Sequence, residues 1–378
     1  MITIKPTVHG HVHLCQTLFR GMAENRTLLP WLEERIWPLE AAHTPETLAV
    51  SVILSLREII STGSTGLLDM GSVQHSSTTV EILKQSGIRA VVCNALMDRG
   101  PHYISKPLSW LIEESNKVQN SCEGLVQYGL APRFVLSCSP ELWKWLETFD
   151  KSIIRTTHAA EAPGEMANEW IAEYGGNIHL LKHLNFLSPK TLLAHCVHLQ
   201  PGEIELLKQT KTSVVHCPWA NLHLGSGIAD IPLLLKNNVN VLLGSDGAPC
   251  NNRLDLSGEV RLASNLAAVK DRPGAISGSK WEQLSSTGAA ELLGFSDFFN
   301  DSIDLQLTRT EEDELNLAED KAKYIAEIPR AGRVKKVTCA GRVIYDNGEF
   351  PTLPKLPMSI ERARDILWRR ASALGMKP

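Results

Sequence analysis

The 378-residue chain has no long apolar run, no marked excess of charge of one sign and no Cys-x-x-Cys pair. No apolar run approaches the roughly 18 residues that cross a bilayer, so we expect no membrane partner. No Lys/Arg run exceeds three residues and the net charge is −4, which argues against a nucleic-acid partner. The N-terminus lacks the features of a signal peptide, so the eight cysteines predict reduced thiols and a cytoplasmic protein.

Apolar, β-rich runs alternate with helical patterns along most of the chain. Hydrophobic residues make up 43% and charged residues 21%, as in ordinary globular enzymes. Eight strands that are each followed by a helix predict an α/β protein built as a (β/α)8 TIM-like barrel. The expected strands are Thr7–Leu14, Thr65–Met70, Arg89–Leu96, Tyr128–Leu136, Ser152–His158, Thr191–His198, Thr212–Cys217 and Asn238–Ser245.

The alternation weakens after about residue 300, so we divide the chain into a barrel at 1–300 and a C-terminal segment at 301–378. Ser302–Tyr324 is charged and irregular in pattern. The residues 334–349 predict a short β-hairpin that turns at Ala340 and Gly341, and Met358–Leu374 predicts a final helix.

Three histidines in the first expected strand point to one face. His9, His11 and His13 alternate along the strand, so their side chains project the same way. A histidine-rich exposed edge is one explanation. A metal site is the other, because neutral imidazole is a preferred ligand of zinc and iron.

Four more expected strands end in residues that can bind metal or move protons. A single such residue has an ordinary explanation, since a strand-end Asp is often a helix cap and a lone His is often structural. Five strand ends together, all on the rim where barrels of this type carry out chemistry, favour a catalytic site. Besides His11 and His13, the residues are His158, Glu161, His195, His198, His216 and Asp246.

These motifs, in this order, resemble the amidohydrolase superfamily over roughly residues 6–300. They are most similar to its mononuclear metal deaminases and chlorohydrolases, a branch that includes deaminases of S-adenosylhomocysteine, methylthioadenosine and 5′-deoxyadenosine, guanine deaminase and the s-triazine hydrolases. The motifs are His11-Val-His13, His158-x-x-Glu161, His195-Cys-Val-His-Leu, His216-Cys-Pro-x-x-Asn221-Leu-x-Leu-Gly-Ser-Gly227 and Gly244-Ser-Asp246-Gly-Ala-Pro-Cys-Asn-Asn252.

The resemblance implies a site with one divalent metal ion, zinc first and iron as the alternative. Its ligands would be His11, His13, His158 and Asp246. A metal ion held by three histidines and one aspartate keeps one coordination position open for water and lowers the pKa of that water towards ~7. Relatives with two metals bridge them by a carboxylated lysine on the fourth strand, and residues 124–138 contain no lysine.

The resemblance also assigns the proton transfers. Glu161 would move a proton from water to the departing nitrogen, and Asp246 could accept the second proton. His195 would orient the water or the substrate, with His198 as the other candidate on that strand. His216 has a pocket or structural role in this interpretation, and His9 has no matching role.

Five residues are candidates for contact with a flat heterocycle. Trp31, Trp37 and Trp219 could stack on the ring, or they could be packing residues. Gln16 could hydrogen-bond a ring nitrogen, and Arg133 would present its guanidinium to the pocket.

The sequence leaves several substrates open. An adenosine-type nucleoside is favoured, but Leu29 stands where some relatives carry a ribose-binding carboxylate, so guanine and amino- or chlorotriazines are alternatives.

Because the first strand begins within ten residues of Met1, we expect the N-terminal half of the family's small β-domain to be absent. The chain could then be an inactive, truncated metal-binding protein. Alternatively, a homodimer could cover the exposed C-terminal half that remains of this β-domain.

Overall fold

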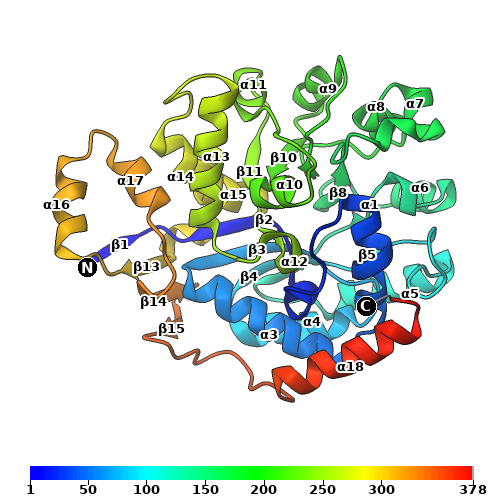
Figure 1. Ribbon diagram of the computed structural model, residues 1–378, viewed down its shortest axis with the longest axis horizontal. Helices are drawn as coiled ribbons and strands as arrows, with labels where there is room; N and C mark the ends of the chain where they lie inside the picture. The colour runs from blue at the N-terminus through cyan, green and yellow to red at the C-terminus, as the bar shows by residue number, and fades with distance from the viewer. Residues whose placement is uncertain (377–378) are drawn as a thin grey trace.

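The computed structural model describes residues 1–376, in which parallel strands alternate with helices as expected (Figure 1). The protein is of the α/β class. Its parallel strands are β2 Thr7–His13, β3 Ser64–Met70, β4 Arg89–Cys93, β5 Ala95–Leu96, β6 Val126–Tyr128, β7 Ala131–Pro132, β8 Arg155–Ala159, β9 Thr191–His195, β10 Ser213–His216, β11 Val241–Leu243 and β12 Asp246–Gly247.

The parallel strands pair in the order of the sequence. One sheet has the order β12-β2-β3-β4-β6 and another the order β11-β10-β9-β8, while β5 pairs with β7. Two isolated parallel bridges, Leu130 with Arg155 and Phe134 with His158, connect the fourth strand position to β8. The carboxyl ends of these strands therefore face the same side, which brings residues distant in the sequence together.

Two of the expected strands are each interrupted. Residues 89–96 form β4 and β5, and residues 128–136 contain the end of β6 and all of β7. The strand expected at 238–245 is shortened to β11, and the separate strand β12 follows it. The fourth position bends at Gly129, where a Cβ atom would lie 2.8 Å from Val91 Cγ1. The chains approach so closely here that only glycine fits without a shift.

Helices connect the strands and cover them. Helix α3 shows why the sequence folds this way: Thr44 caps its first turn by accepting the Thr47 N–H, Pro45 occupies the first turn, and its apolar residues are buried. The connecting helices are α3 Pro45–Ser61, α4 Ser76–Ser86, α5 Leu108–Ser121, α6 Pro140–Leu146, α7 Glu169–Tyr174, α8 Asn177–His183, α9 Glu203–Thr210, α10 Pro218–His223, α11 Ile231–Lys236, α12 Ala248–Asn251, α13 Leu256–Lys270, α14 Gly278–Ser285 and α15 Thr287–Leu292.

The segment after β2 is helical and lies beside the carboxyl ends of the strands. It begins with a 3-10 helix, Leu14–Phe19. Helix α1, Leu28–Trp31, then continues through a π-helical turn, Leu32–Ile36, into α2, Trp37–Ala41. A π turn rotates the residues that follow it, so it changes which side chains face the strands.

A small antiparallel sheet joins the two ends of the chain. Its order is β1-β13-β14-β15, with β1 Ile2–Ile4, β13 Ser302–Leu305, β14 Val334–Cys339 and β15 Arg342–Asp346. The expectation that the N-terminal end contributes nothing to this sheet is wrong, because β1 pairs with β13 (Figure 1). A three-residue strand is too short to give a clear alternating pattern.

The charged stretch Ser302–Tyr324 is also more regular than expected. It contains β13, helix α16 Arg309–Leu317 and the start of α17 Lys321–Glu327. Helix α16 buries none of its residues, so it has no apolar face for a periodicity argument to detect. The last helix, α18 Ile360–Ala373, packs near α2 and α3.

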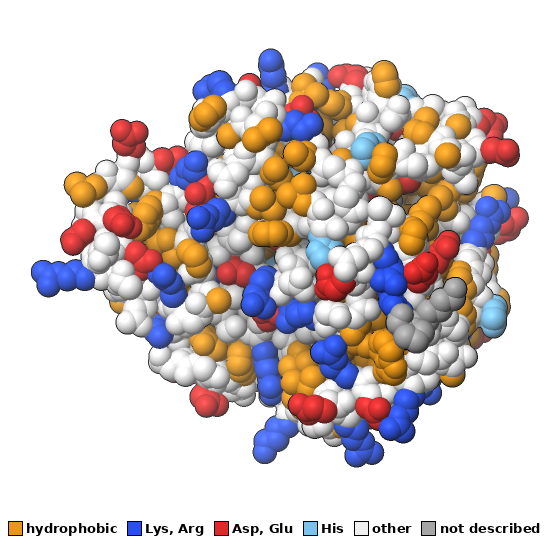
Figure 2. All heavy atoms as spheres, viewed as in Figure 1, with side chains coloured by type: hydrophobic (Ala, Val, Ile, Leu, Met, Phe, Trp, Pro, Cys, Tyr) orange, Lys and Arg blue, Asp and Glu red, His pale blue; other side chains and the backbone are white. Residues whose placement is uncertain are grey.

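Within residues 1–376, no helix combines the length and apolarity needed to cross a membrane. On the face shown in Figure 2, basic and acidic side chains are interspersed.

Candidate active site

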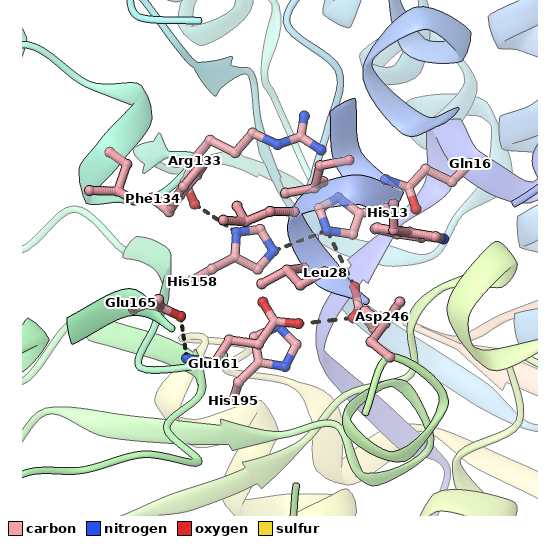
Figure 3. A pocket seen from close by; sticks show the side chains of 15 residues that line it. His13, Gln16, Leu28, Arg133, Phe134, His158, Glu161, Glu165, His195 and Asp246 are labelled. Atoms are coloured by element: carbon pink, nitrogen blue, oxygen red, sulfur yellow. Dashed lines mark hydrogen bonds and ion pairs between the residues drawn. The ribbon is translucent and has the colours of Figure 1, made fainter. Parts of the chain in front are cut away.

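Four side chains from β2, β8 and β12 form a compact cluster that could hold a metal ion. They are His11, His13, His158 and Asp246, and one ligand atom from each lies within 4.8 Å of the others. Figure 3 shows that His13, His158 and Asp246 point toward one another. The structure thus brings together all four residues that the sequence predicted as ligands.

The hydrogen bonds of His13 and His158 leave both Nε2 atoms available as ligands. His13 Nδ1 donates to the Met70 carbonyl at 2.7 Å, and His158 Nδ1 donates to the Arg133 carbonyl at 2.6 Å. Burial lowers the pKa of His13 to about 4 and that of His158 well below 6.5, so both rings are neutral. The two Nε2 atoms then face each other at 3.2 Å as lone pairs, an arrangement that a cation between them would stabilise.

His11 and Asp246 complete the same donor set. Both His11 nitrogens are buried without a hydrogen-bond partner among residues 1–376. Asp246 Oδ1 lies 3.5 Å from His11 Nε2 and 3.4 Å from His13 Nε2. Burial disfavours the charged carboxylate, but His11, His195 and His13 outweigh burial and hold the pKa of Asp246 well below 3.8. Three neutral imidazoles and one carboxylate match the ligand preferences of zinc.

Glu161 and His195 lie next to the cluster. The Glu161 carboxylate is 3.4 Å from His195 Nε2, and His195 Nε2 is 3.9 Å from Asp246 Oδ2. Burial, with contributions from Asp246 and Glu165, raises the pKa of Glu161 well above 4.5. A buried carboxyl group with a raised pKa can carry a proton near neutral pH.

Two residues of this site have a strained backbone conformation. His195 has φ +74° and Asp246 has φ +58°, which place two residues with side chains in the left-handed region. Such conformations cost about 1–3 kcal/mol each and cluster at functional sites. The local turn at each strand end therefore aims a side chain at the site at the expense of stability.

Asn221 holds His195 in place, a role that the sequence analysis did not assign. The His195 ring donates from Nδ1 to Asn221 Oδ1 at 2.8 Å, which orients Nε2 toward Glu161. Asn221 is part of the motif that begins at His216. Its fixed distance from His216 in that motif was the signal in the sequence that could have identified its role.

Glu40 is a second residue that the sequence analysis missed. Its buried carboxylate accepts two hydrogen bonds from the Arg133 guanidinium, at 2.5 and 3.1 Å, and one from Gln16 Nε2 at 2.8 Å. The fork of Arg133 is therefore bound within the protein. No local pattern near either residue indicates this contact, which joins the end of α2 to the fourth strand position.

A cavity of about 580 Å³, including its opening, lies over the cluster (Figure 3). Gln16, Trp31 and Arg133 line it, as the sequence predicted, together with Glu161 and His195. The remaining wall is mostly apolar and contains Leu28, Leu29, Leu32, Phe134, Leu136 and Leu224. The site therefore combines a polar end, which holds the chemical groups, with a wide apolar wall.

The prediction that Trp37 and Trp219 contact a substrate is not supported by their positions. Neither lines the cavity. Trp37 is 5% exposed and belongs to the main hydrophobic core. Trp219 is 45% exposed, and its backbone N–H donates to Glu259. Trp37 follows a π turn and Trp219 lies in the first turn of α10, and neither placement is readable from residue type.

His9 and His198 have partners outside the cluster, whereas His216 Nδ1 is buried without a partner among residues 1–376. His9 shares its two ring nitrogens between the hydroxyls of Ser245 and Ser64, at 2.9 and 3.1 Å. His198 Nε2 donates to the Ser226 carbonyl at 2.6 Å. His216 is buried and does not line the cavity.

A profile of the amidohydrolase family matches residues 8–300. The chain belongs to the amidohydrolase family. This match spans all the parallel strands and confirms the resemblance that the motifs indicated.

Curated and solved members of the family are similar to this amidohydrolase over most of its length. A 5′-deoxyadenosine deaminase of Methanothrix thermoacetophila is 34% identical over 266 residues, which are 70% of this chain and 62% of that protein. A 5-methylthioadenosine/S-adenosylhomocysteine deaminase of Haloquadratum walsbyi is 30% identical and covers 92% of this chain and 80% of its own. The crystal structure of an adenosine deaminase from Xanthomonas campestris with bound zinc has a TM-score of 0.85 at 24% identity, with 99% and 86% coverage.

Proposed function

We propose that the protein is a metal-dependent hydrolase that removes an amino group from an aromatic heterocycle. The observation that carries the proposal is the buried cluster of His11, His13, His158 and Asp246 at the floor of the cavity, in an amidohydrolase. The curated relatives support deamination, because both are deaminases of adenosine-type compounds. We therefore expect an adenosine-type nucleoside as the first substrate to test.

The four ligands would hold one divalent ion, zinc first and iron as the alternative. When bound, the ion lowers the pKa of a water towards neutral and so supplies the nucleophile. The zinc-bound structural neighbour supports a zinc enzyme. We also propose that the parallel strands close into one (β/α)8 barrel at 1–300, followed by a C-terminal segment at 301–378 whose small sheet also includes β1.

The residues around the ligands would manage the protons. A new carbon–oxygen bond forms at the ring carbon, and the carbon–nitrogen bond breaks to release ammonia. Glu161 carries one proton from the water to the departing nitrogen, and Asp246 accepts the other and passes it to the ring nitrogen of the product. His195, oriented by Asn221, hydrogen-bonds the incoming oxygen.

The apolar wall favours a second candidate substrate class. The polar side chains near the wall already form hydrogen bonds within the protein. The Glu40 carboxylate accepts from Arg133 and Gln16, and the Glu165 carboxylate accepts from the backbone N–H of Glu161. The wall thus offers no free carboxylate to ribose hydroxyls among the residues described. Guanine or an amino- or chlorotriazine, which bring no sugar, are the alternative substrates.

A substrate panel separates these candidates. Zinc- and iron-loaded protein is assayed for ammonia from 5′-deoxyadenosine, methylthioadenosine, S-adenosylhomocysteine, guanine and an aminotriazine, and for chloride from a chlorotriazine. We expect ammonia from the adenosine-type compounds. Ammonia from guanine alone would reject that substrate class. No product from any compound would favour an inactive metal-binding protein.

The setting and assembly are proposals of the same kind. All eight cysteines are unpaired, which supports a reducing, cytoplasmic environment. The small sheet ends at β15, so a second copy could pair there in a homodimer. Light scattering of the purified protein gives the oligomeric state.

A further inference from the structure

A second cavity lies away from the catalytic cavity and shares no lining residue with it. This base cavity of about 870 Å³, including its opening, lies between β1, the start of β2, α14 and α17. Thr7 lines it, six residues before His13 on β2. At about 3.3 Å per residue in a strand, Thr7 lies roughly 13 Å along β2 from His11 and roughly 20 Å from His13.

Arg330 lines the base cavity as a buried cation without a partner. Its side chain belongs to a residue that is 4% exposed. Nε and Nη1 have no hydrogen-bond partner, and the guanidinium forms no ion pair with any residue of the described range 1–376. Asp255 and Glu282 act on it through charge alone, from beyond the 4.0 Å of an ion pair. Such a group is costly to bury, so it calls for an anion that the protein does not supply.

The charged side chains that line the base cavity leave it positive, and Asp255 acts on Arg330 from outside this lining. Asp301 is neutralised, since Arg89 donates two hydrogen bonds of 3.1 Å to its carboxylate. Lys5 lines the base cavity as a second cation, and its Nζ donates one hydrogen bond to the Phe299 carbonyl at 2.6 Å. Two N–H groups of Lys5 thus remain for a ligand. Glu282 is the opposing carboxylate, and it is exposed to solvent.

The hydroxyls of the base cavity are fixed as acceptors. Ser286 donates to the Pro6 carbonyl at 2.6 Å, and Ser285 donates to the Trp281 carbonyl at 2.9 Å. Both oxygens keep lone pairs that can accept from a ligand hydroxyl, and no donor among residues 1–376 forms a hydrogen bond to either of them.

We propose that the base cavity binds a small oxyanion, with the Arg330 guanidinium as its main donor. A phosphate or a carboxylate group would pair with Arg330 and Lys5, and a hydroxyl on the same ligand would donate to Ser285 or Ser286. This site is independent of the proposed deamination.

Inorganic phosphate is the first probe, with acetate as the carboxylate probe at the same ionic strength. Calorimetry on the metal-loaded protein should show one saturable site per chain. Arg330→Met should weaken that binding at least tenfold, and Arg309→Gln, which removes an exposed charge on α16, should leave it unchanged. Glu282→Gln should tighten it, because a competing carboxylate is removed. Phosphate binding that persists in Arg330→Met would belong to another site and would overturn the proposal.

Thermal unfolding separates ligand binding from a structural role of Arg330. Without added anion, Arg330→Met should unfold at the same temperature as the wild type or higher, because it loses an unpartnered charge. With phosphate, the wild type should gain stability and the variant should not. Equal losses of stability in Arg330→Met and Glu282→Gln without anion would show that the two residues pair, and would refute an anion site.

Discussion

Replacement of Glu161 by glutamine should separate metal binding from chemistry. Glu161 is 4% exposed and lies 3.4 Å from His195, yet it is outside the group of four ligands. Glutamine has nearly the same shape but cannot carry a proton to the departing nitrogen. We therefore expect Glu161→Gln to keep its metal and to lose its turnover.

The size of the loss follows from the role of the residue. A positioned general acid or base contributes about 10²–10⁴ in rate. At about 1.4 kcal/mol for each factor of ten, this is about 3–5 kcal/mol of transition-state stabilisation. The thermal stability of the variant should not fall with its activity. Burial raises the pKa of Glu161, so a neutral amide should raise the melting temperature of the metal-free protein or leave it unchanged.

The assay measures ammonia release, metal content per chain and melting temperature on the same samples. Glu169→Gln, the same change at an exposed position on α7, should match the wild type in all three. Activity of Glu161→Gln within threefold of the wild type would refute the proton-transfer role. Loss of the metal together with activity would show instead that Glu161 is a ligand.

Three further predictions concern the surroundings of the site. His13→Ala should lose the metal ion, whereas His9→Ala should retain it in elemental analysis, because His9 bonds two serine hydroxyls instead. Glu40→Gln should cost about 3–5 kcal/mol in urea unfolding, because it leaves the Arg133 guanidinium buried without its carboxylate, and adding Arg133→Met should recover much of that loss. Burial raises the pKa of Asp69 from 3.8 to about 7, so the folded protein holds this proton more tightly than the unfolded chain. The stability of the metal-free wild type relative to Asp69→Asn should thus fall as pH rises from about 4 to 7, by at most about 1.4 kcal/mol per pH unit.

Each of these has a clear contrary result. Metal loss in His9→Ala would make His9 part of the site. A cost under 1 kcal/mol for Glu40→Gln would mean that water reaches Arg133. A stability difference between wild type and Asp69→Asn that is flat with pH would show that Asp69 stays charged when folded.

The strand ends were the most predictable part of this protein. Alternation along a strand placed His11 and His13 on one face, and the shared direction of parallel strands brought His158 and Asp246 to them. Residue type and local period sufficed here, because metal ligands are of few kinds and their strands are strongly apolar.

Contacts that do not follow from the shared direction of the strand ends were not predictable. Glu40 meets Arg133 across 93 positions of sequence, and nothing local marks either residue as a partner of the other. Trp37 follows a π-helical turn, so helical periodicity misplaces its ring. The strand Ile2–Ile4 and the exposed helix α16 lack the apolar pattern from which such elements are predicted.

The most direct test of a single-metal deaminase is a zinc titration of the metal-free protein, with ammonia release from 5′-deoxyadenosine recorded at each step. We expect no activity without metal and a linear rise in activity that stops at one ion per chain. Activity in the metal-free protein, or a rise that continues to two ions per chain, would contradict it.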